Sequence, residues 1–217
     1  MPFDFLRRKK PEEAPKAAAT EPAGPARPSA TIRFDGLTEE WRLVGQMHIE
    51  GRLSDVLNKR AAVPISDVSW APIDGSGKFA SVPGLKSVDP YDLILVFAGS
   101  SSSPPMSEAE KAGFMVHKVP YDVGLEAPPF RVVGTVYMLP GAEPRRLLER
   151  GTEMFVPAVG AVAWLGDKRL NEEDVDAILV NRFYLRAVEL VDKRTGERVQ
   201  PLPGAPLGGT SWQDKSR

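Results

Sequence analysis

Two segments of the sequence repeat one residue pattern in the same order, and this internal similarity restricts the fold more than any other feature. Residues 41–49 read WRLVGQMHI and residues 130–138 read FRVVGTVYM, so an Arg, a Val and a Gly recur 89 residues apart. A second match, ISDVSW at 65–70 and VGAVAW at 159–164, follows in the same order. Repeats of this kind indicate one structural unit used twice. We therefore interpret the chain as two diverged copies of one small domain.

The spacing of apolar residues predicts mostly strands in each copy. Apolar and polar positions alternate in residues 41–49 and again in 130–138, which is typical of a strand with one buried face. A short helix is expected next, with Ser54 or Asp55 near its start in the first copy and Pro144 in its first turn in the second.

An upstream strand, at 31–34 in the first copy and 116–123 in the second, is expected to pair with the strand at 41–49 or 130–138 through a hairpin loop at 36–40 or 124–129. Two more strands complete each predicted unit. The third strand ends at Trp70 or Trp164, and the two tryptophans are expected to occupy equivalent places. The closing strands are the apolar segments 93–97 and 177–180, LILVF and AILV. The predicted fold class is β-rich α+β, with two tandem copies of a small twisted sheet or partly open barrel, each with one short helix.

Gly45 and Gly134 lie at matching positions in the two copies, inside strands that are otherwise rich in larger side chains. A glycine in a strand interior often marks a close approach of a neighbouring chain. We expect both glycines to lie where a Cβ atom has no room.

Segment composition predicts the boundaries of the domains. Residues 11–30 are rich in Pro and Ala and contain no large apolar side chain to bury, which favours a disordered linker. Residues 100–105 read SSSSPP and are expected to separate the copies. The predicted organisation is a leader and linker at 1–30, a first repeat at 31–99, a linker with a short helix at 100–115, a second repeat at 116–192 and a tail at 193–217.

The most distinctive local motif is RLSDVLN at residues 52–58. It follows a strand that contains Arg42 and Gly45, and it resembles a family of uncharacterised bacterial domains in which a strand precedes Arg-Leu-Ser-Asp, an apolar residue and Leu-Asn. The resemblance covers residues 42–68, reaches the second copy only in outline, and implies a domain without implying an activity.

The polar residues of this motif have two interpretations. Ser54 and Asp55 can cap a helix that Asn58 ends, which would make the motif structural. The alternative is that Arg52, Asp55 and Asn58 form a polar recognition patch, although the second copy carries different chemistry near these places.

Composition argues against several functional classes. The chain has 28 basic and 29 acidic residues, so its net charge of −1 supplies no overall attraction to nucleic acid or anionic membranes. It has no cysteine, which excludes disulfides, thiolate metal sites and a cysteine nucleophile. The two histidines, His48 and His117, lack the spacing of a metal motif. We expect no catalytic residue, no metal and no cofactor.

The first ten residues combine apolar and basic side chains ahead of the predicted linker. Large apolar groups on a tail that cannot fold tend to contact another surface, and adjacent cations are attracted to anionic membranes. We expect this leader to contact either a groove on a partner or a membrane surface. Its candidate binding residues are Phe3, Phe5, Leu6, Arg7, Arg8, Lys9 and Lys10.

The leading functional hypothesis is a non-enzymatic binding or scaffolding module, tethered by the leader to a protein partner or to a membrane surface. The first alternative is a small-barrel nucleic-acid-binding protein, which the balanced charge disfavours. The second is an enzyme with an unrecognised site. No run approaches the length of a membrane span, so the expected location is the cytoplasm, with the periphery of the membrane as a further option.

Overall fold

The computed structural model describes residues 29–99, 102, 118–149, 151, 153–171 and 175–199. The leader with its candidate binding residues, the predicted linker helix, His117 and the end of the chain from residue 200 lie outside the described residues. The described elements are β1 Ser29–Leu37, β2 Trp41–Glu50, α1 Leu53–Asn58, β3 Val63–Pro72, β4 Ala80–Ser81, β5 Ser87–Val88, η1 Pro90–Asp92, β6 Leu95–Ala98, β7 Val119–Ala127, β8 Phe130–Met138, η3 Pro144–Leu148, β9 Phe155–Leu165, β10 Lys168–Arg169, β11 Ala177–Asn181, η4 Arg182–Tyr184 and β12 Ala187–Leu190.

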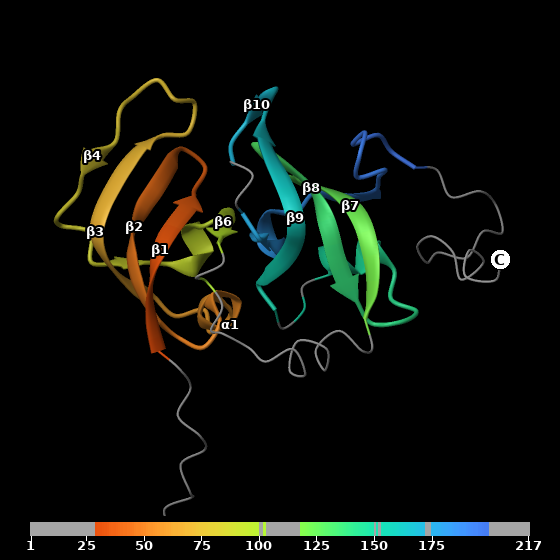
Figure 1. Cartoon of the computed structure of the whole chain (residues 1–217), viewed down its shortest axis with the longest axis horizontal. Coiled ribbons are helices and arrows are strands. Elements are labelled where there is room, and N and C mark those ends of the chain that lie inside the picture. Colours follow the sequence, from red (N-terminus) through yellow and green to blue (C-terminus); the bar gives the residue numbers. More distant parts are fainter. Residues whose placement is uncertain are drawn as a thin grey trace, which may run out of the picture.

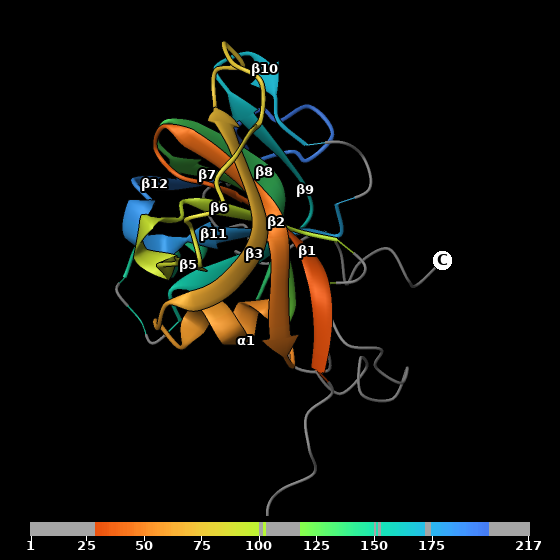
Figure 2. The ribbon, with the colours of Figure 1, turned by 90° about the vertical axis from the view of Figure 1, so that its left-hand side faces the viewer.

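These strands form one open antiparallel sheet in the order β12-β7-β8-β9-β11-β6-β1-β2-β3-β4, with β10 added to β9 and β5 to β3. The prediction of a β-rich chain with few helices is therefore confirmed. We call residues 29–99 the first half and residues 118–199 the second half. The halves lie side by side, and β6 and β11 run between them (Figure 1). Seen from the side, α1 lies across the end of β2 (Figure 2).

The strand pairings of the first half recur in the second half with matching registers. Leu37 of β1 lies opposite Arg42 of β2, and 89 positions later Glu126 of β7 lies opposite Arg131 of β8. The register between β2 and β3 shifts after Val44, and the register between β8 and β9 shifts at the corresponding residue, Val133.

Both register shifts are accompanied by a residue with positive φ. Asp67 in β3 and Gly160 in β9 each have a φ of 52°. They lie 93 positions apart, which is also the spacing of the β3 and β9 residues that pair at the shift. Such β-bulges insert one extra residue and increase the local twist of the strand.

The closing strands correspond differently from the prediction. β6 pairs with β1, and its counterpart by pairing is β12, which pairs with β7. β11, which contains the predicted closing segment 177–180, pairs with β9, as β5 pairs with β3. The predicted equivalence of segments 93–97 and 177–180 is thus wrong. Both segments are almost wholly buried, so apolar character alone could not separate their roles.

The two tryptophans also fail to correspond. Trp70 lies opposite Leu43, whereas Trp164 lies opposite Arg131, the counterpart of Arg42. The prediction of equivalent places is wrong by one residue, and a shift of one residue sends a strand side chain to the other face of the sheet.

The expectation of one short helix in each copy is not met in the described residues. α1 is an α-helix of six residues, while η3 in the second half is a 3₁₀ segment that begins at Pro144. α1 ends at Asn58, as the motif suggested. Its N-cap is Arg52, and no side chain caps it, so the predicted capping by Ser54 or Asp55 is absent.

Gly45 and Gly134 have no room for a side chain, as predicted. A Cβ on Gly45 would lie 2.8 Å from the backbone oxygen of Ser66, and one on Gly134 would lie 2.5 Å from the Cβ of Ala161. Both glycines sit at the register shifts, where the neighbouring strand comes close.

The apolar core is shared between the halves. One cluster joins Leu37 and Phe97 of the first half to residues of the second half such as Phe130. The other joins α1 and β2 of the first half to Met154 and Phe155 of the second. Neither half therefore encloses a separate core.

Candidate binding site at the junction of the two halves

The junction is held by a strand ladder and by one buried amide. β6 and β11 pair over four residues, from Ala98 opposite Ala177 to Leu95 opposite Val180. The fully buried Asn181 donates its Nδ2 hydrogens to the carbonyl oxygens of Leu93, at 2.7 Å, and Pro90, at 3.3 Å. The Oδ1 atom of the same side chain accepts from the backbone nitrogen of Phe183. Asn181 therefore fixes η4 against η1.

Two short 3₁₀ segments meet at this place. Asp89 caps η1 by accepting a hydrogen bond from the backbone nitrogen of Tyr91, just as Asn181 caps η4. The rings of Tyr91 and Phe183 stack with their centroids 5.8 Å apart. The hydroxyl of Tyr184 donates to the backbone oxygen of Tyr91 at 3.1 Å. These contacts place Asp92 and Tyr184 on one surface.

That surface contains an open hollow of roughly 380 Å³ that both halves line. We call it the acidic hollow. The turn between β1 and β2 and the end of η1 supply its first-half residues, and η4 supplies its second-half residue. It is lined by Thr38, Glu39, Glu40, Trp41, Asp92 and Tyr184.

The turn that carries the two glutamates is ordered by Thr38. Its Oγ1 atom accepts from the backbone nitrogen of Trp41 at 3.0 Å, and its backbone nitrogen donates to the oxygen of Trp41 at 2.8 Å. Because this turn is short and closed by hydrogen bonds, it holds in place the backbone of the exposed residues Glu39 and Glu40.

An aromatic wall borders the carboxylates. Trp41 stacks on Trp70 with ring centroids 5.1 Å apart, and each side chain remains 36% exposed. Two exposed stacked tryptophans leave a large apolar surface in contact with water, and exposed aromatic surface of this kind marks interaction sites.

The charges of the acidic hollow affect the pKa of the Tyr184 hydroxyl. Partial burial raises the pKa of the Tyr184 hydroxyl above its ordinary value, and the negative charges of Glu39 and Asp92 raise it further. Glu39 and Asp92 thus produce a negative potential at the Tyr184 hydroxyl, on the aromatic edge of the hollow. Such a site favours a cation, which can pair with the carboxylates and lie over the rings.

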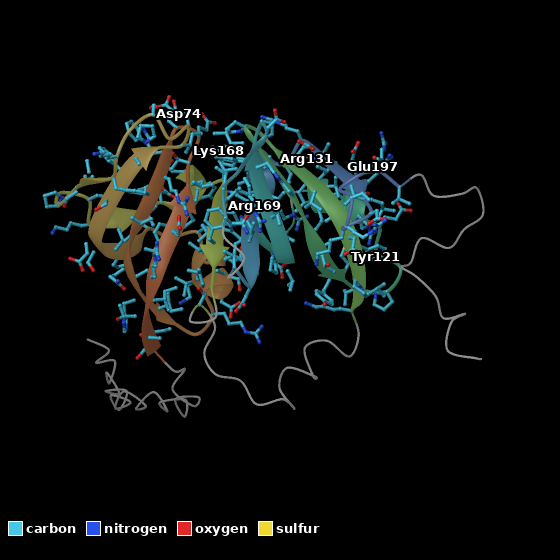
Figure 3. All side chains as sticks on the ribbon, turned by 45° about the horizontal axis from the view of Figure 1, so that its top comes forward. Asp74, Tyr121, Arg131, Lys168, Arg169 and Glu197 are labelled. Atoms are coloured by element: carbon cyan, nitrogen blue, oxygen red, sulfur yellow. The ribbon has the colours of Figure 1, made fainter. Side chains whose placement is uncertain are left out.

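A second, smaller hollow of roughly 190 Å³ is lined by Leu37 and Arg42, which flank the β1–β2 turn, and by residues of both halves. The loop after β3 and strand β10 meet there, and Lys168 donates to the backbone oxygen of Asp74 at 3.3 Å. Figure 3 shows Asp74 in the loop after β3 and, beside it, Lys168 and Arg169 of β10.

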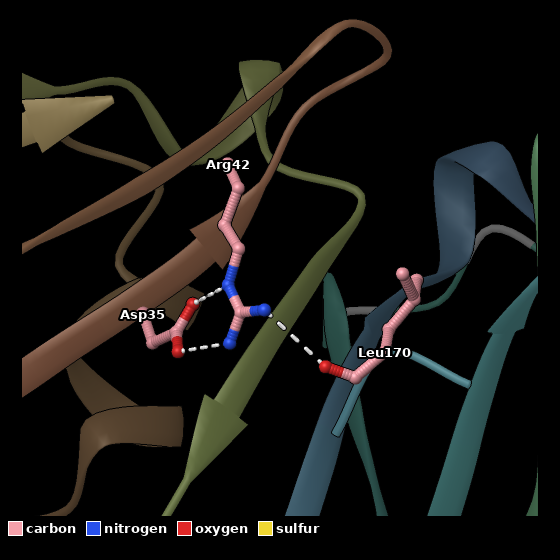
Figure 4. Close-up of polar contacts among 3 residues, drawn as sticks. All are labelled: Asp35, Arg42 and Leu170. Carbon is pink, nitrogen blue, oxygen red and sulfur yellow. Dashed lines mark hydrogen bonds and ion pairs between the residues drawn. The ribbon is translucent and has the colours of Figure 1, made fainter. Parts of the chain in front are cut away.

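Arg42, which the sequence comparison singled out, spans this part of the junction. Its guanidinium donates to both carboxylate oxygens of Asp35, at 2.9 and 2.7 Å, and to the backbone oxygen of Leu170 at 3.3 Å (Figure 4). It also lies 5.3 Å from the ring centre of Phe97. Arg42 therefore links the two halves, whereas Arg131, the Arg at the matching position of the second half, pairs with Glu126 of its own half.

The residues of the predicted recognition patch are spread along α1. Arg52 precedes the helix, Asp55 is exposed in its first turn, and Asn58 ends it. The amide oxygen of Asn58 accepts from the backbone nitrogens of Met154 and Phe155 at 2.8 and 2.7 Å. This contact makes Asn58 a link between α1 and β9.

The residues of the acidic hollow were not among the sequence candidates. Thr38 to Trp41 and Tyr184 are about 140 positions apart, and no local pattern joins them. The one signal in the sequence is the pair of glutamates directly before an aromatic residue, in a loop that the strand pattern predicts only as a hairpin turn.

No group of three or more His, Cys, Asp or Glu in the described part of the chain could hold a metal ion. Within the same residues, no helix has the length and apolarity needed to cross a membrane. Comparisons with protein-family models, curated proteins and solved structures find no match to this chain.

Proposed function

We propose that this protein is a non-enzymatic binding module. In the acidic hollow it binds a segment of a partner protein whose Lys or Arg side chains can pair with the carboxylates and pack against the aromatic rings. The observation that carries the proposal is the combination of three carboxylates with the exposed Trp41 ring in a hollow to which both halves contribute. A Lys or Arg side chain placed there would gain an ion pair and a cation–π contact together.

We further propose that the module consists of two diverged copies of one small, partly barrel-shaped domain. The matching registers of β1–β2 with β7–β8 and of β1–β6 with β7–β12 support this view, as do the paired bulges at Asp67 and Gly160. In this account, duplication created the junction, and the junction created the hollow.

The proposal is tested by fluorescence anisotropy with a labelled octapeptide of four Arg/Lys and two Phe residues, compared with its Glu-substituted counterpart. The full chain is expected to bind the basic peptide and not the acidic one. Exposed ion pairs contribute roughly 0.2–1 kcal/mol each, so the Glu39→Gln/Glu40→Gln variant, which loses two carboxylates, should bind about two- to thirtyfold more weakly. Raising the salt concentration should weaken the wild type in the same direction.

Trp41→Ala tests the aromatic contribution, and Phe79→Ala is its matched control. Phe79 is 51% exposed and lines the smaller hollow instead. Loss of peptide affinity in Trp41→Ala with no change in Phe79→Ala supports the acidic hollow as the site. Equal affinities in wild type, Trp41→Ala and Glu39→Gln/Glu40→Gln would refute it.

A further inference from the structure

We propose that residues 3–10 of the same molecule occupy the acidic hollow in cis and so compete with an external partner. This inference rests on the proposed function, because it assigns a regulator to the same site. The apolar and basic side chains of the leader would then have a binding surface on the same chain.

The chemistry of the segment complements that of the hollow. Residues 7–10 are four consecutive cations, and Phe3, Phe5 and Leu6 precede them. The hollow supplies the carboxylates of Glu39, Glu40 and Asp92 beside the rings of Trp41 and Tyr184. Cations adjacent to aromatic residues are the combination that can satisfy both parts of this lining.

The length of the connecting chain fits the distance to be crossed. The described chain begins at Ser29, and β1 then runs nine residues to Leu37, directly before the hollow. At about 3.4 Å per residue this strand separates Ser29 from the hollow by roughly 27 Å. Residues 11–28 would span roughly 23 Å as a flexible chain and about 55 Å if extended by their prolines.

A tether whose average span matches the distance gives the highest effective concentration, which reaches the millimolar range for short linkers. A segment with only weak intrinsic affinity would therefore fill the hollow for much of the time. An external basic segment would have to bind more tightly than this internal one, or bind after the leader is engaged elsewhere. The leader would thus set the threshold for partner binding.

The absence of cysteine from the sequence allows a direct test in the full chain. The double variant Asp4→Cys/Glu40→Cys places one thiol in the leader and one at the hollow. The control, Asp4→Cys/Glu197→Cys, places the second thiol on the exposed turn after β12, at a residue that does not line the hollow (Figure 3). Under mild oxidation, the first variant is expected to form an intramolecular disulfide at least several-fold faster than the control.

Adding Phe3→Ser, Phe5→Ser and Leu6→Ser to the first variant is expected to reduce its rate to that of the control. Equal rates in the two double variants would overturn the inference. Disulfides that form only between molecules would also overturn it, since the segment would then reach a second copy. Vesicles of phosphatidylserine that bind the leader while the cross-linking rate stays at the control level would assign it to a membrane.

The basic octapeptide separates failure of this inference from failure of the proposed function. In the chain with Phe3, Phe5 and Leu6 replaced by Ser, the peptide is expected to bind at least threefold more tightly than in the wild type. Equal affinity of the peptide for both chains would contradict the inference that the leader competes for the hollow, and it would leave the proposed binding function unaffected. If the peptide binds neither chain, the proposed function itself is contradicted.

Discussion

Asn58 shows how one side chain can decide the interpretation of a motif. Its amide sits at the end of α1, and its oxygen serves two backbone nitrogens of the other half. Both residues that donate to it, Met154 and Phe155, are fully buried. A polar group in this position is required by the burial of its partners, because an unpaired buried N–H group is costly.

Asn58→Ala is expected to lower the free energy of unfolding by about 1–3 kcal/mol, since two buried N–H groups lose their acceptor. Asp55→Ala, on the exposed side of the same helix, should change it by less than about 0.5 kcal/mol. Urea denaturation of the full chain measures both. Equal effects of the two substitutions would show that the Asn58 contact does not support the fold.

Tyr184 reports on the charge of the acidic hollow. Folding raises the pKa of its hydroxyl, chiefly through burial and then through Glu39 and Asp92. The neutral phenol is therefore favoured in the folded state. Its contribution to stability is fully present below the unfolded pKa of about 10 and is lost as the pH rises through the higher folded pKa.

The phenolate absorbance of wild type minus that of Tyr184→Phe is expected to titrate with a midpoint above the ordinary value of about 10. Glu39→Gln should move this midpoint down without restoring the ordinary value, because burial is the larger cause. Asp55→Asn, which removes a charge from α1, should leave it in place. A midpoint unaffected by Glu39→Gln would mean that the glutamate does not act on the hydroxyl.

At the scale of elements, the sequence predicts those features that depend on the residue type at a single position. Gly45 and Gly134 recur because a close strand leaves no room for a Cβ, and this requirement is visible in the residue itself. The predicted equivalence of segments 93–97 and 177–180, which lie in β6 and β11, is wrong because buried strands share an apolar composition. Asp89 and Asn181, which lie 92 positions apart, cap the 3₁₀ segments that precede β6 and β12 in the same way.

The close approach at Gly134 gives a prediction about β8 and β9. Gly134→Ala would bring a Cβ within 2.5 Å of the Ala161 Cβ and 3.0 Å of its Cα, so the strands must move apart. Overpacking of this kind costs about 1–3 kcal/mol. Gly84→Ala is the matched control, because nothing lies within 4 Å of its added Cβ. Thermal unfolding should separate the two variants, and coincident curves would contradict the account of the bulge.

At the scale of the whole molecule, the junction explains why the sequence does not predict the acidic hollow. The acidic hollow depends on Tyr184 meeting the turn after β1, and that contact exists only after β6 and β11 have paired. Strand periodicity predicts which residues are buried in each half. It does not predict which loops of different halves come together.

Because both apolar clusters contain residues of both halves, the molecule is expected to unfold in one transition. The chain has four tryptophans, and Trp212 lies outside both halves. Trp164→Phe/Trp212→Phe leaves Trp41 and Trp70 to report on the first half, and Trp41→Phe/Trp70→Phe/Trp212→Phe leaves Trp164 to report on the second. Within each variant, the urea midpoints from tryptophan fluorescence and from circular dichroism should coincide. Separate midpoints would show that the halves fold independently.

The most direct test of the central claim maps where a cationic segment binds. Amide and indole NMR shifts of the ¹⁵N-labelled full chain are followed during addition of the basic octapeptide. The account predicts that the largest shifts fall on Thr38 to Trp41, Asp92 and Tyr184, and so on both halves at once. Shifts confined to α1 or to the loops around Lys168, or no saturable shifts at all, would contradict it.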